Sequence, residues 1–295
     1  MNKAVLAVVV AVMMMAVATK AYKPIVFMHG ITGSYLEFKQ LTEELERYQP
    51  GHPVFALNVD NEWSSMKKLQ ILVDDATKVL KDTIANNTEV FKDGFIFIGH
   101  SQGGIISRAM IQQNAWNITK YISLAGVQSG FFGACDVFVP GNLTCDALTD
   151  LLYTKYMQES FSAAGYWRSP EREFYLEKNL FLPVLNNEEG VSTSPEYQQM
   201  LKDNFLRVQK YYFFGSPADE VIEPWFTSLF QTLDTDYETM IPIEKQYIYQ
   251  KDTFGLKTAM DQGRVQFIEV PNVKHEEWIQ GRTDIYYDYL FPLFD

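Results

Sequence analysis

The feature that constrains the fold most is an apolar run leading directly into a serine between glycines. Residues 95–98 (FIFI) are typical of a buried strand, GHSQGG follows at 99–104, and helical spacing of apolar residues begins at Ile105. A serine between a strand and a helix needs small neighbours, because the two backbones pass close together there, and this is the setting of a nucleophile elbow. The stretch predicts that Ser101 is a nucleophile at the end of a sheet. The alternative is a glycine-rich turn without chemistry.

The N-terminus has the three parts of a secretory signal. Lys3 precedes an apolar run from Ala4 to Ala18, and small residues up to Ala21 close it. This run is shorter than the ~20 residues that a membrane span needs. We therefore expect residues 1–21 to be a cleaved signal peptide, cut after Ala18 or Ala21, rather than a retained anchor.

Two further features agree with a secretory route. Asn86, Asn117 and Asn142 each begin a glycosylation sequon. The only cysteines are Cys135 and Cys145. In an oxidising compartment we expect them to form a disulfide that contributes about 2–3 kcal/mol by loop closure. Their spacing excludes a CxxC redox or metal motif.

Composition limits the classes of partner. The 295-residue chain is 47% hydrophobic and 21% charged, with a net charge of −12. These values are typical of a globular protein and leave no basic face for nucleic acid. An acidic surface also repels anionic membranes, so we expect lipid contact through apolar groups and no stable membrane insertion after signal cleavage. We expect a monomer or weak dimer. No metal site, P-loop or dinucleotide fingerprint is present, and we expect no cofactor.

Strands and helices alternate along most of the chain. The predicted strands are residues 24–28, 54–57, 95–98, 121–125, 208–214 and 265–270. Helices are expected at 63–84, after Ser101 and at the C-terminus, the last containing Trp278 and Leu290. This order predicts an α/β fold with a mostly parallel sheet flanked by helices. We expect one domain over 22–295.

The alternation lapses between about 127 and 206, where helical fragments are rich in aromatic residues. An insertion of this length between sheet strands predicts a helical cap over the carboxyl ends of the strands, where α/β proteins bind ligands. The alternative is a helical subdomain with its own small core. A second aromatic-rich excursion covers 223–262.

A serine nucleophile needs a base, and the chain has only four histidines. His52 precedes a strand and belongs to the wrong end of the sheet. His100 adjoins the nucleophile and cannot easily turn onto it, and His29 lies in the loop after the first strand. His275 follows the last strand by a short loop, so it is the base by elimination.

The base needs an orienting carboxylate. Asp219 follows the strand ending at Phe214, with Glu220 and Glu223 as longer-chain rivals. The order Ser101, Asp219, His275 is that of the α/β-hydrolase triad. For the oxyanion hole we expect the amide of Gln102, next to the nucleophile, and that of Ile31 in the loop after the first strand.

An ordered set of motifs runs through nearly the whole mature chain. Its members are His29, Gly30 and Ser34, SQGG at 101–104, Tyr166, Trp167 and Pro170, Val221, Ile222, Pro224 and Trp225, and FGLKT at 254–258. This set resembles the palmitoyl-protein thioesterases, a lysosomal family that removes fatty acyl groups from cysteine, and is closer to their type-2 branch. It places the same three catalytic roles on Ser101, Asp219 and His275.

The sequence departs from the family pattern in places. The family usually has Asp where Gly33 stands, an aromatic residue where His100 stands, and His-Asp where Arg168-Ser169 stand. It also tends to have more cysteines. No catalytic group is lost, and the departures bear on acyl-chain and head-group preference.

The resemblance implies hydrolysis of long-chain S-acyl thioesters of proteins, peptides or CoA through an acyl-serine intermediate. We expect the cap and the 223–262 excursion to form the acyl groove, with Phe131, Trp167 and Trp225 as candidates to contact the chain. The alternatives are a lipase or carboxylesterase acting on oxygen esters, and a non-catalytic secreted binding protein on a hydrolase scaffold. The expected location is the secretory pathway, in the lysosome or outside the cell.

Overall fold

The structure is a computed structural model that describes residues 22–133 and 145–295. Its centre is a six-stranded sheet with strand order β2-β1-β3-β4-β5-β8, in which every neighbouring pair is parallel. The strands are β1 (Ile25–Met28), β2 (Val54–Ala56), β3 (Phe95–His100), β4 (Ile118–Leu124), β5 (Lys210–Gly215) and β8 (Val265–Glu269). β1 and β3 are buried along their whole length, as apolar runs in a doubly covered parallel sheet should be. The predicted mostly parallel α/β architecture is confirmed.

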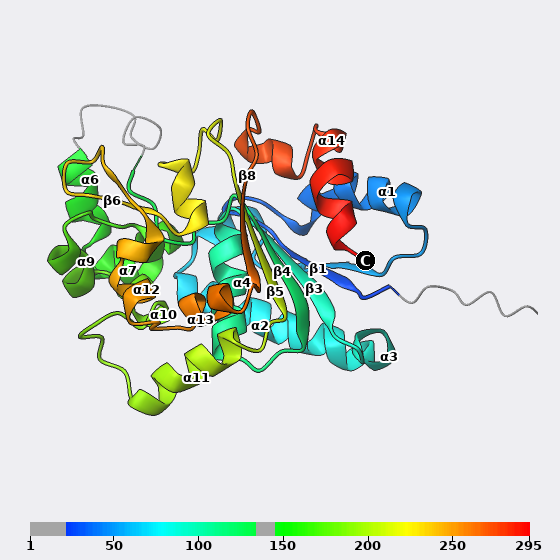
Figure 1. Cartoon of the computed structure of the whole chain (residues 1–295), viewed down its shortest axis with the longest axis horizontal. Coiled ribbons are helices and arrows are strands. Elements are labelled where there is room, and N and C mark those ends of the chain that lie inside the picture. Colours follow the sequence, from blue (N-terminus) through cyan, green and yellow to red (C-terminus); the bar gives the residue numbers. More distant parts are fainter. Residues whose placement is uncertain (1–21, 134–144) are drawn as a thin grey trace, which may run out of the picture.

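Helices cover both faces of the sheet (Figure 1). On one face, α4 packs against α2 and α11. On the other, α1 meets the C-terminal segment, where the Tyr48 and Phe291 rings stack with centroids 5.1 Å apart. These elements are α1 (Lys39–Tyr48), α2 (Leu69–Asn86), α3 (Thr88–Phe91), α4 (Gln102–Gln113), α11 (Pro195–Phe205), α14 (Thr283–Ile285), η6 (Tyr286–Leu290) and η7 (Phe291–Leu293).

A group of short helices lies between β4 and β5 in the chain and gathers beyond one end of the sheet, at the left of Figure 1. These cap helices are α6 (Cys145–Leu152), α7 (Lys155–Ser160), α8 (Ser162–Tyr166), α9 (Arg172–Lys178) and α10 (Leu182–Leu185). Phe131, in the segment before these helices, forms an isolated β-bridge with Trp167, which follows α8. The excursion after β5 contains η3 (Trp225–Leu229), the two-stranded β6 (Thr232–Leu233) and β7 (Met240–Ile241), η4 (Ile243–Lys245), α12 (Tyr247–Gln250) and α13 (Leu256–Asp261).

Two predicted helices are wrong in their extent. The helix expected over 63–84 is divided into η2 (Glu62–Met66) and α2, because Lys67 and Lys68 have extended ψ angles of 166° and 130°. Its regular apolar spacing in fact starts at Leu69. The expected C-terminal helix is broken into η5 (His275–Trp278), α14, η6 and η7, with Gly281 at a φ of +86° after η5.

The register of the sheet brings several loops to one edge. Met28 pairs with Gly99, Leu124 with Phe214, and Gly215 with Glu269. Because all strands are parallel, the residues that follow these positions share the carboxyl edge of the sheet. The loops after β1, β3, β5 and β8 therefore meet there, and these loops carry the predicted catalytic residues.

Some predictions fall outside the described residues. The signal peptide (1–21), Cys135 and Asn142 are among them, so the signal, the disulfide with Cys145 and glycosylation of Asn142 stay predictions. Asn86 and Asn117 are exposed, as glycan attachment requires. Within residues 22–133 and 145–295, none of the helices combines the length and apolarity of a membrane span.

Candidate active site

Ser101 sits on a strained turn between β3 and α4. Its φ of +55° and ψ of −128° lie in a region that non-glycine residues rarely occupy. The amide of Ser101 donates to the carbonyl of Leu124 (3.0 Å), and its carbonyl accepts from Gly104 (2.9 Å). Hydrogen bonds on both sides hold the serine at the start of a buried helix, which is the geometry of a nucleophile elbow.

The glycines around Ser101 are required by close backbone approach. A Cβ atom on Gly103 would lie 2.2 Å from the carbonyl oxygen of Met28, and one on Gly99 would lie 2.5 Å from the carbonyl oxygen of Gly103. Both contacts are with backbone, so neither is relieved by a side-chain rotation. β1, β3 and α4 can approach this closely only because both positions lack side chains.

The loops after β5 and β8 bring Asp219 and His275 together. Nδ1 of His275 lies 2.9 Å from Oδ2 and 3.1 Å from Oδ1 of Asp219. Oδ1 also accepts the backbone amides of Val221 (2.9 Å) and Ile222 (2.8 Å). The side chains of His275 and Asp219 are only 3% and 1% exposed. A buried carboxylate anchored in this way fixes the orientation of the imidazole and leaves Nε2 as the nitrogen available for proton transfer.

The rival acid and the other histidines have different partners. Glu220 accepts the backbone amide of His275 (3.2 Å) and therefore supports the loop rather than the ring. His52 contacts the carbonyl of Lys23 (2.8 Å), ahead of β1 and far from the carboxyl edge. Both ring nitrogens of His29 face carbonyls, those of Gly30 (2.9 Å) and Val59 (2.7 Å).

The backbone of His275 contacts the elbow through His100, the residue before Ser101. Its carbonyl oxygen accepts a hydrogen bond from Nε2 of His100 (3.0 Å), and the two imidazole rings lie 4.9 Å apart. Among the described residues no hydrogen bond joins Ser101 Oγ to the His275 ring. Such contacts are often long in free enzymes and tighten when substrate binds.

The loop after β1 places a backbone amide beside Ser101. A Cβ atom on Gly30 would lie 3.0 Å from the Cβ of Ser101, so this loop touches the serine. Gly30 N donates to Glu37 Oε1 (3.3 Å) and Thr32 N to Ser65 Oγ (2.6 Å). The amide between them, Ile31 N, has no partner among the described residues. The same is true of Gln102 N at the start of α4, so two donors are left for an oxyanion.

Two residues that the sequence did not single out hold these donors in place. Ser65 of η2 accepts Thr32 N, and its carbonyl accepts Nε2 of Gln102 (2.8 Å). Glu37 of η1 (Tyr35–Phe38) accepts Gly30 N. Neither residue belongs to a recognisable motif, and only the folded chain brings them to the serine.

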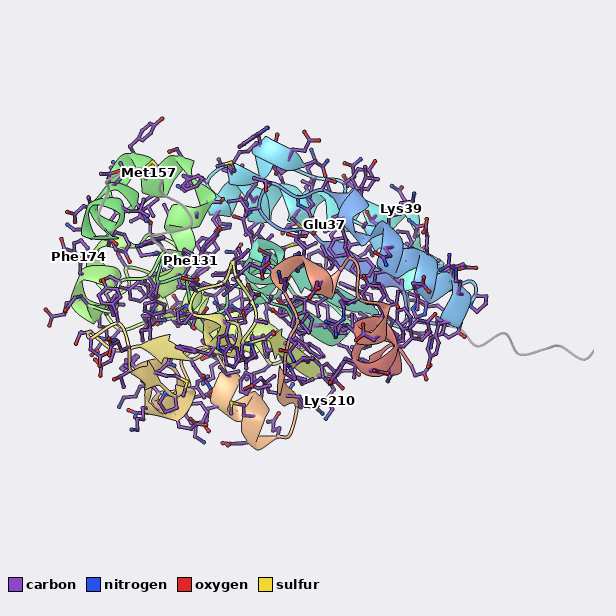
Figure 2. All side chains as sticks on the ribbon, turned by 90° about the horizontal axis from the view of Figure 1, so that it is seen from above. Glu37, Lys39, Phe131, Met157, Phe174 and Lys210 are labelled. Carbon is purple, nitrogen blue, oxygen red and sulfur yellow. The ribbon has the colours of Figure 1, made fainter. Side chains whose placement is uncertain are left out.

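An apolar cavity of about 180 Å³ opens at Ser101 and runs under the cap helices. Phe131 and Trp167, both predicted to contact an acyl chain, line it, and Figure 2 shows Phe131 and Met157 among the cap elements. The full lining is Ile31, Ser101, Val127, Phe131, Leu148, Leu151, Leu152, Met157, Phe161, Ala163, Tyr166, Trp167, Val221 and Ile222. Almost every group in this wall is apolar, so the cavity suits a hydrocarbon chain attached to a group at the serine.

Trp225, the third predicted acyl contact, does not line this cavity. It lies in η3, where its ring packs edge-on against Phe226 (6.0 Å) and close to the backbone of Gly215. The sequence pattern identified it as aromatic and near a strand end, and η3 places its ring beside the end of β5.

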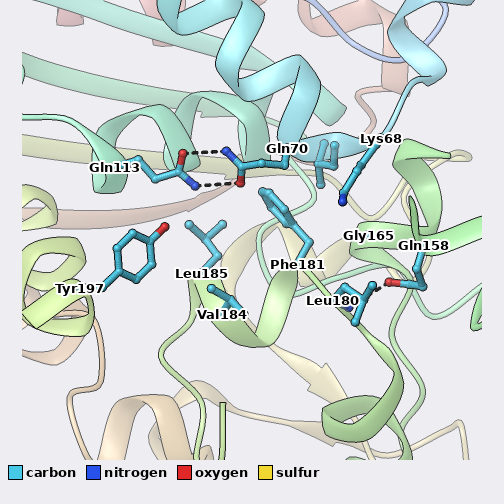
Figure 3. Close-up of a pocket in the computed structure, with 11 residues that line it drawn as sticks. Lys68, Gln70, Gln113, Gln158, Gly165, Leu180, Phe181, Val184, Leu185 and Tyr197 are labelled. Atoms are coloured by element: carbon cyan, nitrogen blue, oxygen red, sulfur yellow. Dashed lines mark hydrogen bonds between the residues drawn. The ribbon is translucent and has the colours of Figure 1, made fainter. Parts of the chain in front are cut away.

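A second cavity of about 170 Å³ lies between α2, α4, α8, α10 and α11 (Figure 3). A reciprocal amide pair between Gln70 and Gln113 (3.0 and 3.1 Å) borders it. None of the predicted site residues is part of its wall. Ser101 is not among its lining residues, so this cavity is separate from the one at the elbow.

No cluster of three or more His, Cys, Asp or Glu side chains with metal-binding geometry occurs in the described ranges 22–133 and 145–295. The carboxyl edge carries Ser101, the Asp219–His275 pair and two backbone donors. This donor set is that of serine acyl transfer.

Comparison with known proteins agrees with this geometry. The family model for palmitoyl protein thioesterase matches residues 24–275. The lysosomal thioesterase PPT2 homolog of Drosophila melanogaster is 31% identical over 93% of each chain. Lysosomal thioesterase PPT2-B of Xenopus laevis is 34% identical over 89% of this chain and 90% of its own.

A solved structure supports the fold independently. Carboxyl esterase 2 of the fungus Tuber melanosporum superposes with a TM-score of 0.51 at 13% identity, covering 92% of this chain and 78% of its own. At that identity the likeness concerns the α/β-hydrolase fold alone. The match of the family model over nearly all of the described chain, together with the two animal relatives, shows that this protein belongs to the palmitoyl protein thioesterase family.

Proposed function

We propose that this protein hydrolyses long-chain S-acyl thioesters, with Ser101 as nucleophile, His275 as base and Asp219 as its orienting acid. The single observation that carries the proposal is the position of Ser101: it stands on a strained elbow at the mouth of an apolar cavity. Membership of the thioesterase family and the Asp219–His275 contact support it.

The reaction follows from the groups at the carboxyl edge. Oγ of Ser101 attacks the thioester carbonyl as its proton passes to Nε2 of His275, and the amides of Ile31 and Gln102 stabilise the oxyanion. Collapse of the tetrahedral intermediate breaks the C–S bond, and the imidazolium protonates the leaving sulfur. A water molecule, deprotonated by His275, then attacks the acyl-serine, which releases the fatty acid and restores Ser101.

Thioester chemistry makes chain binding the main demand on the protein. A thiolate is a good leaving group, so the barrier depends less on acid catalysis than in an amide or oxygen ester. Each buried methylene contributes about 0.8 kcal/mol, or roughly fourfold in kcat/KM if the contact persists in the transition state. An apolar cavity beside the nucleophile therefore selects long chains.

The test is a series of acyl-CoA thioesters from acetyl to stearoyl. We expect kcat/KM to rise steadily with chain length and to level off when the cavity is full. Equal kcat/KM for acetyl and palmitoyl thioesters would contradict the proposal. A paired palmitoyl oxygen ester should be cleaved more slowly than the thioester, and the reverse order would favour a lipase or carboxylesterase.

We also propose that the chain follows the secretory route to the lysosome. The relatives named above are lysosomal thioesterases, and residues 1–21 have the composition of a cleaved signal. N-terminal sequencing of protein recovered from lysosomes and from medium should give a mature start at Thr19 or Tyr22. Recovery of the intact N-terminus in the cytosol would refute the route.

A further inference from the structure

The reaction proposed above leaves one buried titratable group at the site unused. His100 precedes the nucleophile, its side chain is 2% exposed, and no step requires it. Its Nε2 donates to the carbonyl of His275 (3.0 Å), and its Nδ1 lies 3.5 Å from Oε1 of Glu37. The second distance is that of an ion pair rather than a well-formed hydrogen bond.

The two neighbours determine the protonation of the ring. A backbone carbonyl only accepts hydrogen bonds, so Nε2 must carry a hydrogen. In a neutral ring Nδ1 would then present a lone pair to an ionised carboxylate, which is repulsive. An imidazolium beside an ionised Glu37 satisfies both contacts at once.

Glu37 connects the ring to the loop that carries the expected oxyanion donor. Its Oε1, the atom nearest His100, also accepts the amide of Gly30 (3.3 Å). A Cβ atom on Gly33 would lie 2.1 Å from Oε2 of Glu37. The carboxylate therefore occupies space that a side chain at position 33 would fill. Gly33 and His100, two departures from the family pattern, meet at Glu37.

We propose that Glu37 and His100 form a charged positioning pair that links the oxyanion loop, the nucleophile elbow and the backbone of the catalytic base. The pair touches Gly30 on one side, is continuous with Ser101 through the chain, and holds the His275 carbonyl on the other side. The expected effect of the pair on turnover rests on the proposed function, whereas the protonation state of His100 does not.

The surrounding charges favour the imidazolium. Glu37 faces His100 from η1 and Glu276 acts on it from η5. His275 lies on the same side, with Asp219 at its ring and Glu220 at its backbone amide. Burial lowers the pKa of His100, but Glu37, Glu276 and the bond to the His275 carbonyl outweigh it and hold this pKa above its ordinary value of 6.5.

The sign of the pH effect follows. Because the folded-state pKa of His100 is raised, its contribution to stability is fully present below pH 6.5, the ordinary value, and is lost as pH rises through the folded value. The stability difference between wild type and His100→Phe should therefore be larger at pH 6 than at pH 9.

The first experiment observes the protonation of His100 without any substrate. Nitrogen-15 NMR of the four histidine rings, assigned with single variants, reports both ring nitrogens of each. We expect the pKa of the His100 ring to lie above its ordinary value of 6.5, and we expect this pKa to be lower in Glu37→Gln. A neutral His100 ring at pH 6 would overturn the pair. This result is independent of whether the protein cleaves thioesters.

The second experiment is a double-mutant cycle with Glu37→Gln and His100→Phe, read as kcat and KM on a palmitoyl thioester. Each single variant should lower kcat about tenfold with little change in KM, and the double variant should be no slower than the worse single one, since contacting residues act as a unit. His100→Gln, whose amide can still donate to the His275 carbonyl, should recover part of the loss.

Matched controls separate positioning from folding. His52→Phe removes a buried histidine that also contacts a backbone carbonyl, and Glu43→Gln changes an exposed acid of α1. Both should keep wild-type kcat even if His52→Phe lowers the melting temperature. Independent, multiplying effects of Glu37→Gln and His100→Phe, or kcat unchanged in both, would overturn the positioning role.

Discussion

The carboxyl edge of the sheet and the cap are built from different interactions. At the edge, Ser101, Asp219 and His275 are held by backbone hydrogen bonds, close glycine contacts and buried polar pairs. The wall of the cap cavity consists mainly of apolar side chains, although hydrogen bonds such as Ser162 Oγ to the Ser65 carbonyl (3.2 Å) and Arg168 Nη1 to the Ser129 carbonyl (2.9 Å) also join the cap to the rest. The polar groups at the edge are defined by directed contacts, whereas the cavity is defined by the volume and shape of its apolar wall.

We propose that the two regions have different tasks. Acyl transfer depends on the exact placement of the reacting atoms, since a misplacement of about 1 Å can cost roughly a hundredfold in rate, and a dense hydrogen-bonded frame supplies that placement. Selection of a hydrocarbon chain needs buried area and tolerates variation in detail. Substitutions at the edge should therefore reduce the rate on every substrate, and those in the cap should change the order of preference among substrates.

The largest effect is expected for Ser101→Ala. Removal of the proposed nucleophile should lower kcat by at least about 10⁴-fold on acetyl and palmitoyl thioesters alike, because binding and the oxyanion donors alone remain. The melting temperature should stay the same or rise, since the substitution leaves the elbow in place. A loss of activity on long-chain thioesters alone would contradict the division between chemistry at the carboxyl edge and chain selection by the cap.

Asp219→Asn should lower kcat by about 10⁴-fold or somewhat less. The amide keeps the shape of the side chain but favours the wrong tautomer of His275 and cannot stabilise the imidazolium. The measurement is steady-state hydrolysis across the chain-length series, with Glu220→Gln as the matched neighbour. Glu220 accepts the backbone amide of His275 and not its ring nitrogen, so a larger loss in Glu220→Gln would make Glu220 the orienting acid.

Ala163→Phe tests the cap. Ala163 lines the apolar cavity, so the larger ring fills space that the distal part of a long chain would use. We expect kcat/KM for palmitoyl thioester to fall about tenfold to a hundredfold, equivalent to two or three lost methylene contacts, with short-chain substrates unaffected. Leu180→Phe, at the second cavity, should leave the profile unchanged. An equal loss on all chain lengths would contradict the separation.

The smallest effect is expected for Trp225→Phe. Sequence reasoning placed Trp225 against the acyl chain, whereas the structure packs it beside Phe226 and β5. The chain-length profile should keep its shape, with kcat/KM changed by less than about twofold. If kcat/KM in this variant levels off at a shorter chain length than in the wild type, Trp225 contacts the acyl chain after all.

Much of the edge could be predicted because its signals are local. The elbow is contiguous in sequence, and Asp219 and His275 each follow a recognisable strand, so chain order and parallel topology suffice to bring them together. The start of α2 was missed because apolar spacing alone does not reveal that Lys67 and Lys68 are extended. The break at Gly281 was missed for the same reason.

The cap and the Glu37–His100 pair could not be predicted in detail. Periodicity identifies amphipathic helices but not which apolar face lines a cavity, so Leu148, Met157 and Phe161 carried no distinguishing signal. Glu37 and His100 are 63 positions apart; Glu37 belongs to no catalytic pattern, and His100 occupies a position of the elbow motif that the motif does not specify. Their contact arises only when η1 folds over the end of β3.

The most direct test of the central claim is covalent labelling with a fluorophosphonate, followed by mass spectrometry of the labelled peptide. The label should sit on Ser101, be lost in Ser101→Ala, and persist in His52→Ala. A non-hydrolysable palmitoyl thioether should protect Ser101, and an acetyl analogue at the same concentration should not. Label on another residue, or equal protection by both analogues, would contradict a Ser101 nucleophile served by an apolar cavity.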